Sequence, residues 1–97
     1  NKIDFVGLKY LNMAEVMEKT ICVNDCSNEV LAMTIGCKGK NFINWTENSK
    51  GINFIWHNKE TNKIEIKGEK DGEFNNVMQT IRNVLAFNKQ IILDRNK

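Results

Sequence analysis

Two glycines separated by two residues, with lysines beside them, form the stretch of this sequence best suited to chemistry. Gly36 and Gly39 enclose Cys37 and Lys38, and Lys40 follows. Glycine permits backbone conformations closed to other residues and lets another molecule approach the main chain closely. Free N–H groups at the start of a following helix favour a negative group, and lysine ammonium groups would neutralise it. The pattern is therefore suited to binding a phosphate.

The same two glycines also fit a purely structural role. Glycine commonly ends a helix as a C-cap and begins a turn. The four residues alone do not separate this role from phosphate binding, so the elements around the loop have to decide between them.

Other reactive side chains give little support for an enzyme or a metal site. Cys37 is a conceivable nucleophile, but no base or oxyanion motif accompanies it. His57, the only histidine, has no Ser, Cys or carboxylate partner at a recognisable spacing and is expected in a solvent-facing turn. Cys22 and Cys26 are not matched by a second Cys or His pair, which argues against structural zinc. We therefore expect no catalysis, no metal and no cofactor.

Composition indicates one small globular domain. The chain has 97 residues, of which 41% are apolar and 27% charged, enough for a single modest core. No apolar run is long enough to predict a membrane span, and no signal peptide is recognisable. We therefore expect a cytoplasmic or nuclear location and no membrane partner. The net charge of +2 is only weakly basic. Any binding of nucleic acid must therefore depend on a local basic patch.

The first half of the chain predicts one strand and two helices around the glycine loop. A β-branched run over 19–23 indicates a strand. Ser27 is an N-cap for a helix over 28–35, and a second amphipathic helix is predicted over 40–48. Residues 1–18 are interpreted as an N-terminal extension or linker with a short helix.

The second half predicts two strands and a longer helix. Ile52, Phe54 and Trp56 alternate along the first strand, and Ile64 and Ile66 alternate along the second. A helical apolar stripe then begins near residue 71 and ends near residue 88. Phe42, Trp45 and Trp56 are assigned to the core by their spacing, as is Ile81.

In this order of elements, the sequence resembles a KH domain of type I. The resemblance rests on Ile35, the loop from Gly36 to Gly39, and Phe42 three positions later, and it covers residues 19–88. It implies an α+β fold in which a three-stranded antiparallel sheet packs on three helices in the order β-α-α-β-β-α. It also implies a groove for about four unpaired nucleotides of RNA or single-stranded DNA, RNA being the expected ligand.

The resemblance also implies which residues bind. Gly36, Cys37, Lys38, Gly39 and Lys40 would contact the backbone phosphates, with Lys50, Lys59 and Lys63 as outer candidates. Ile43 and Ile55 would form the apolar floor, together with Leu31 or Ile35. Ile55 is chosen because it lies on the strand face opposite Phe54 and Trp56, where it is expected to be exposed. The alternative is a KH-like protein-interaction or dimerisation module that does not bind nucleic acid.

The last residues of the sequence are not explained by a single KH-like unit. Residues 89–97 are interpreted as a C-terminal tail or the start of a following unit. Ile91, Ile92 and Leu93 follow the predicted closing helix, and continuing that helix would demand a wider apolar face than residues 74–85 show. The sequence therefore predicts a strand over 91–93, as in tandem KH proteins of the fragile X-like kind, and a neighbouring KH unit or self-association.

Overall fold

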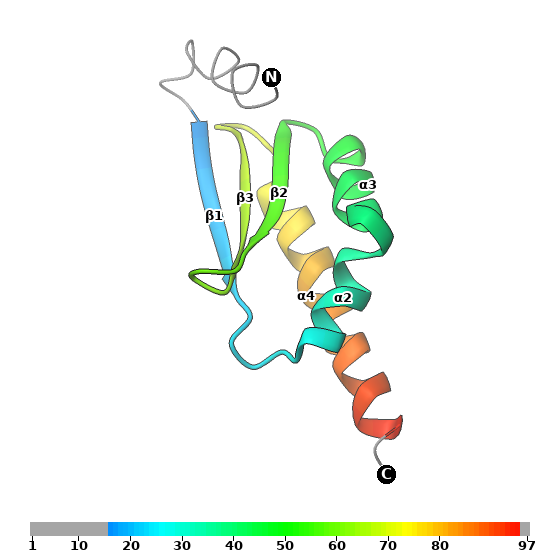
Figure 1. Ribbon diagram of the computed structural model, residues 1–97. Helices are drawn as coiled ribbons and strands as arrows, with labels where there is room; N and C mark the ends of the chain where they lie inside the picture. Colours follow the sequence, from blue (N-terminus) through cyan, green and yellow to red (C-terminus); the bar gives the residue numbers. More distant parts are fainter. Residues whose placement is uncertain (1–15, 96–97) are drawn as a thin grey trace.

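Three strands form one antiparallel sheet in the computed structural model, which describes residues 16–95 (Figure 1). The strands are β1 (Val16–Cys22), β2 (Ile52–Asn58) and β3 (Lys63–Glu69). β3 lies in the centre and pairs with both others, so the order is β1-β3-β2. β2 is therefore an edge strand, and one of its edges is left without a strand partner in the described part of the chain.

The helices of residues 16–95 all pack on one face of this sheet (Figure 1). They are α2 (Asn28–Ile35), α3 (Lys40–Asn48) and α4 (Phe74–Arg95), and the short 3-10 turn η1 (Cys37–Gly39) separates the first two. Ser27 caps α2, because its Oγ accepts a hydrogen bond from Val30 N at 3.2 Å. The predicted α+β fold, with the order β-α-α-β-β-α, is confirmed, and it is consistent with a KH type I fold.

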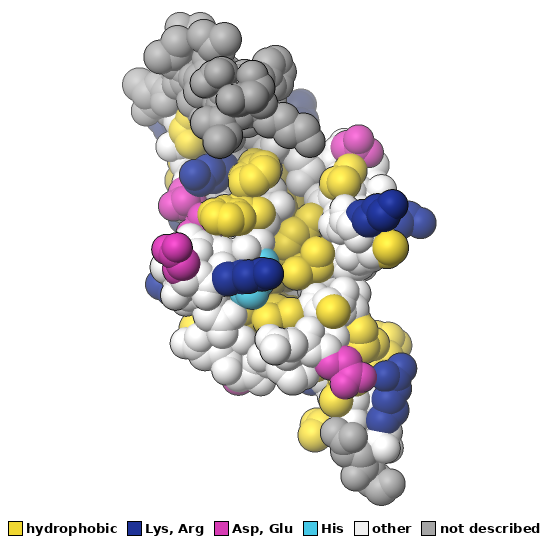
Figure 2. Space-filling view, viewed as in Figure 1, with side chains coloured by type: hydrophobic (Ala, Val, Ile, Leu, Met, Phe, Trp, Pro, Cys, Tyr) yellow, Lys and Arg dark blue, Asp and Glu magenta, His cyan; other side chains and the backbone are white. Residues whose placement is uncertain are grey.

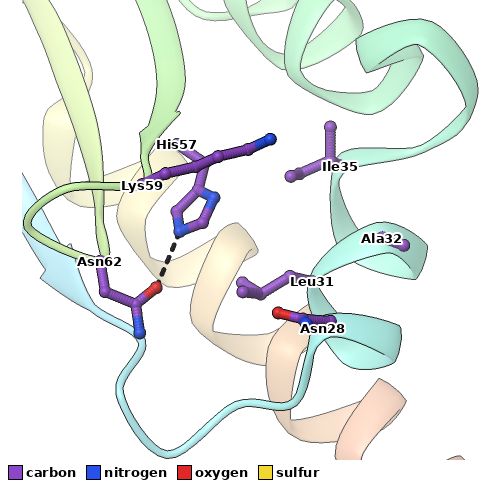
Figure 3. Close-up of a pocket in the computed structure, with 7 residues that line it drawn as sticks. All are labelled: Asn28, Leu31, Ala32, Ile35, His57, Lys59 and Asn62. Atoms are coloured by element: carbon purple, nitrogen blue, oxygen red, sulfur yellow. Dashed lines mark hydrogen bonds between the residues drawn. The ribbon is translucent and has the colours of Figure 1, made fainter.

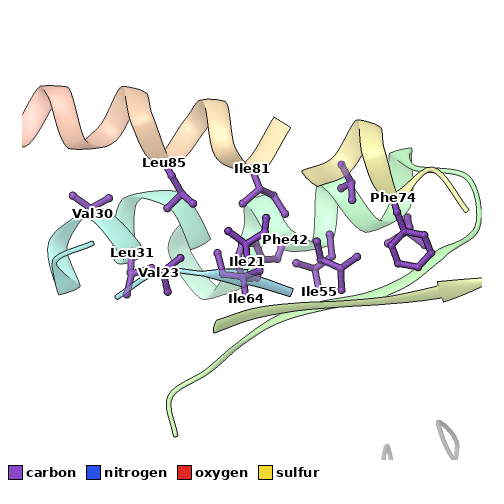
Figure 4. Packing of buried hydrophobic residues seen from close by; sticks show 13 residues of the cluster. Ile21, Val23, Val30, Leu31, Phe42, Ile55, Ile64, Phe74, Ile81 and Leu85 are labelled. Atoms are coloured by element: carbon purple, nitrogen blue, oxygen red, sulfur yellow. The ribbon is translucent and has the colours of Figure 1, made fainter. Parts of the chain in front are cut away.

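Inward-facing side chains of the sheet meet the apolar stripes of the helices in one core (Figure 4). Phe42 and Ile81 are buried, as predicted. Trp45 is half-buried and packs beside Phe42, with ring centroids 5.8 Å apart. The other buried apolar residues are Ile21, Val23, Val30, Leu31, Ile52, Ile55, Ile64, Ile66, Phe74, Val77 and Leu85.

The faces predicted for β2 are wrong because the strand is irregular near its start. The pairing register with β3 shifts between Ile52 and Phe54, and such a shift moves the following side chains to the other face. Ile52 and Ile55 are both buried, whereas Phe54 and Trp56 are 42% and 39% exposed. Trp56 is therefore not a core residue, and Ile55 is not exposed.

β1 begins earlier than predicted. Val16 pairs with Glu69 and Met17 with Gly68, so residues 16–18 belong to the sheet and not to an N-terminal helix. Met17 packs against the core, which explains why the strand extends this far. The rest of the predicted helix lies outside the described residues.

α4 continues to Arg95, so the strand predicted over 91–93 is wrong. Ile92 lies seven residues after Leu85, on the same side of the helix, and packs against the core. Asn88, at the predicted end of the helix, is buried. Beyond it, Lys89 pairs with Asp25 and Arg95 pairs with Glu29 of α2. The apolar side of α4 therefore continues along the helix to Ile92, and contacts with the α2 region hold these last turns in place. Within residues 16–95, no helix is both long and apolar enough to cross a membrane.

Candidate nucleic-acid interface

The glycine loop is a tight turn held by backbone hydrogen bonds. Gly36 N donates to Ala32 O at 3.0 Å, which ends α2, and Gly39 N donates to Gly36 O at 3.1 Å. Lys38 has a left-handed backbone conformation with φ 57°, and Gly39 follows with φ 76°. Positive φ is uncommon for a lysine. The turn therefore presents the Lys38 side chain from a backbone conformation that few loops use.

The two glycines are required for different reasons. Gly36 has φ 83° and ψ 167°, a region that is essentially restricted to glycine. A Cβ atom there would also lie 3.1 Å from the side chain of Asn41, which itself donates a hydrogen bond to Thr34 O at 3.1 Å. At Gly39 a Cβ would meet no atom within 4 Å, so only its positive φ favours glycine. Gly39 also leaves the first N–H groups of α3 without a side-chain cap.

A groove runs between β2 and the helices α2 and α3. Its central hollow, of about 350 Å³, is lined by Ile35, Lys38, Gly39, Phe42, Ile43, Ile55, Trp56, His57 and Lys59. A second hollow continues along α3 and shares Phe42, Ile43 and Ile55 with it. A third continues along α2 and shares Ile35, His57 and Lys59. We call these three connected hollows the groove, and Figure 2 shows hydrophobic side chains gathered there with lysine or arginine on both sides.

The structure brings together five of the eight predicted site residues. Ile35, Lys38, Gly39, Ile43 and Ile55 come from four successive elements and line the central hollow. Ile43 is 52% exposed, which is unusual for an apolar helix residue, whereas Ile55 reaches the groove as a buried residue at its floor. Ile43 and Ile55 therefore both line this hollow, and Ile55 does so as a buried residue and not as the exposed residue that was expected.

The other three predicted residues do not line the groove. Gly36 shapes the turn, while Cys37 and Lys40 are exposed beside it. Leu31, the alternative floor residue, is buried and lines the hollow along α2.

The positive charge of the central hollow comes from opposite sides. Lys38 lies on the glycine loop and Lys59 follows β2, and both line that hollow. Lys59 was only an outer candidate in the sequence, where a single lysine of a polar turn carries no sign of its position. Glu47 lines the hollow along α3. The groove is therefore apolar along its floor, basic at its centre and acidic at one end.

Sequence reasoning missed the polar side chains of the groove. His57 was expected in a solvent-facing turn, but it is half-buried and hydrogen-bonded to Asn62 Oδ1 at 2.9 Å. Trp56 lines the central hollow, and its Nε1 donates to Glu65 Oε1 at 2.7 Å. Asn28 and Asn62 line the hollow along α2. No periodic pattern in the sequence marks Asn28 and Asn62 as groove residues, and the shifted register of β2 hid the position of Trp56.

Titratable groups with clearly shifted pKa values lie outside the groove. A hydrogen bond from Lys89 lowers the pKa of Asp25, and the same bond raises the pKa of Lys89. Burial raises the pKa of the Cys26 thiol. In the described part of the chain, no three His, Cys, Asp or Glu side chains are grouped so that they could hold a metal ion. The groove thus combines a hollowed shape, apolar side chains and lysine ammonium groups.

Comparison of the chain with family models, curated proteins and solved structures gave no match. The inference of function therefore depends on the groove itself.

Proposed function

We propose that this chain binds single-stranded nucleic acid, RNA in preference to DNA. The observation that carries the proposal is the convergence of Ile35, Lys38, Gly39, Ile43 and Ile55 on one hollow. These residues were selected from the sequence by their resemblance to a nucleic-acid-binding motif, and they are separated by up to 20 positions in the chain.

The chemistry of the groove suits a strand with unpaired bases. Lys38 and the uncapped start of α3 lie on one side, where phosphates would find an ammonium group and backbone N–H groups. The exposed Ile43 side chain and the Ile55 floor would pack against base faces, which are hidden in a duplex but accessible in a single strand. The resemblance to a KH domain implies that about four nucleotides would fill the groove.

The proposal is tested by putting negative charge into the loop. Cys37→Asp combined with Lys38→Asp leaves both glycines in place, so the turn is kept while two anions face the phosphates. We expect affinity for a pool of randomised RNA hexamers, measured by calorimetry, to fall at least tenfold with little change in melting temperature. Wild-type binding should also weaken as salt is raised, because phosphate neutralisation releases counterions.

A matched control changes the net charge equally at another site. Gln79→Asp combined with Arg82→Asp alters two exposed positions on α4. This variant should retain affinity within about twofold. Equal losses in both double variants would show that only net charge matters, and unchanged affinity in the loop variant would remove the loop from binding.

Two exposed side chains on α4 favour the second candidate, an interaction or dimerisation module. Phe87 and Leu93 are 67% and 59% exposed, and large exposed apolar side chains are enriched where proteins associate. This candidate predicts a dimer in sedimentation equilibrium that Phe87→Ser disrupts, with no binding of oligonucleotides.

A further inference from the structure

The hollow along α2 is lined by both apolar and polar side chains. It has a volume of about 620 Å³ and is lined by Leu31, Ala32 and Ile35 on one side and by Asn28, His57, Lys59 and Asn62 around them (Figure 3). It shares Ile35, His57 and Lys59 with the central hollow. A strand lying in the central hollow can therefore place its next base here.

The position of the His57 ring is fixed by Asn62. Asn62 Oδ1 lies 2.9 Å from His57 Nε2, while Asn62 Nδ2 donates to Asn24 Oδ1 at 3.0 Å. The carbonyl oxygen of Asn62 also accepts a hydrogen bond from Val23 N at 3.2 Å. Asn62 is therefore hydrogen-bonded to Asn24 and Val23 as well as to His57, and these bonds hold its amide oxygen toward the imidazole.

This contact selects the tautomer of His57. An amide oxygen only accepts hydrogen bonds, so Nε2 must carry the proton. Nδ1 of a neutral ring is then an acceptor, and no described residue donates to it. Figure 3 shows this second ring nitrogen turned away from Asn62, toward the side of the hollow formed by α2.

We propose that the hollow along α2 is a base-selecting subsite, in which His57 Nδ1 accepts a hydrogen bond from an exocyclic amino group, which adenine, cytosine and guanine carry and uracil lacks. The apolar side chains of Leu31 and Ile35 would contact the base face, and Lys59 would neutralise an adjacent phosphate. A base without a donor at that position would leave Nδ1 unpaired and bind more weakly. This inference rests on the proposed function and names the base class that it prefers.

The test compares two RNA hexamers that differ only in the amino group. One is made of adenosine and the other of purine riboside, which has the same ring system without the amino group. At pH 8, we expect the wild-type chain to bind the adenosine hexamer about three- to tenfold more tightly by calorimetry. His57→Phe keeps a flat ring but removes the acceptor, so this ratio should fall to about one.

Asn58→Ala is the matched control, because Asn58 is next in sequence to His57 but does not line this hollow. It should keep the wild-type ratio. A ratio that stays within twofold of the wild-type value in His57→Phe would overturn the subsite, and so would an equal loss in Asn58→Ala.

A measurement without substitution keeps the inference testable if His57→Phe does not fold. Long-range ¹H–¹⁵N spectra of the wild-type chain should show a protonated Nε2 and a bare Nδ1, and the adenosine hexamer should shift the Nδ1 resonance. A proton on Nδ1 in the free chain would overturn the assignment. Binding of both hexamers with equal affinity would overturn the subsite alone, whereas binding of neither would overturn the proposed function as well.

Discussion

Asn88 on α4 donates a hydrogen bond from Nδ2 to Thr34 Oγ1 on α2, at 3.0 Å, and both side chains are buried. Thr34 Oγ1 in turn donates to Val30 O at 2.8 Å, and Thr34 O accepts from Asn41 Nδ2 just beyond the glycine loop. This short network therefore connects the last helix to the segment that carries the loop.

Removing one member of the pair should destabilise the fold. Asn88→Ala deletes the donor and leaves a small cavity, while Thr34→Val leaves the amide of Asn88 buried without its partner. Each should lower the free energy of unfolding by about 1–3 kcal/mol, measured by urea denaturation. The double variant should lose less than the sum of the two, and strict additivity would show that the hydrogen bond contributes little.

Substitutions at two neighbouring residues on α3 should affect stability and nucleic-acid binding separately. Phe42 is 5% exposed and Ile43 is 52% exposed. Phe42→Ala should destabilise the chain by about 3–5 kcal/mol, because it empties a large buried site. Ile43→Ala should change the melting temperature little but weaken binding of RNA hexamers severalfold. The assignment of Ile43 to the groove fails if its variant binds as tightly as the wild type.

The two loop glycines should differ in their tolerance of alanine. Gly36→Ala places a side chain in a region of φ and ψ open essentially to glycine and against Asn41, so we expect a loss of about 3 kcal/mol. Gly39→Ala enters open space in a left-handed conformation and should lose only about 1 kcal/mol. Thermal denaturation followed by circular dichroism measures both. A Gly36→Ala variant as stable as Gly39→Ala would contradict the described turn.

Acid should weaken the contact between Asp25 and Lys89. The pKa of Asp25 is held below its ordinary value of about 3.8, chiefly by the hydrogen bond from Lys89. A lowered carboxyl pKa gives stability that is present above the ordinary value and is lost as pH falls through the folded value. The melting temperature of Lys89→Gln should therefore lie below that of wild type at pH 6 and converge with it as the pH falls through the lowered pKa of Asp25.

The same contact should weaken in strong base. The pKa of Lys89 is raised above 10.5 by its bond to Asp25, so this stability is lost as pH rises through that higher value. Lys70→Gln is the control, because Lys70 is exposed and makes no ion pair within residues 16–95. Both groups of the pair are solvent-exposed, so the differences should be small and should shrink in salt.

The local elements were predictable from the sequence because local signals define them. Ser27 and Gly36 begin and end α2 at the predicted positions, and α3 spans residues 40–48 as predicted. The loop residues and the exposed Ile43 follow from this order. They could therefore be assigned to one side of the fold before its shape was known.

The parts that were not predictable depend on contacts between distant segments. The shifted register near Ile52 is set by pairing with β3, and one inserted residue reverses the faces that alternation predicts. The last turns of α4 are helical because Ile92 and Asn88 find partners in the core and on α2. His57 joins the groove through Asn62, five residues away across a turn. None of these contacts leaves a periodic trace in the sequence.

The separate positions of the two tryptophans give this small chain two intrinsic optical reporters. Trp45 packs beside Phe42, whereas Trp56 lines the central hollow. Quenching of Trp56 fluorescence should therefore follow occupation of the groove, while the emission of Trp45 should follow unfolding. In the Trp45→Phe and Trp56→Phe variants each signal is isolated, so ligand binding and stability can be recorded without a label.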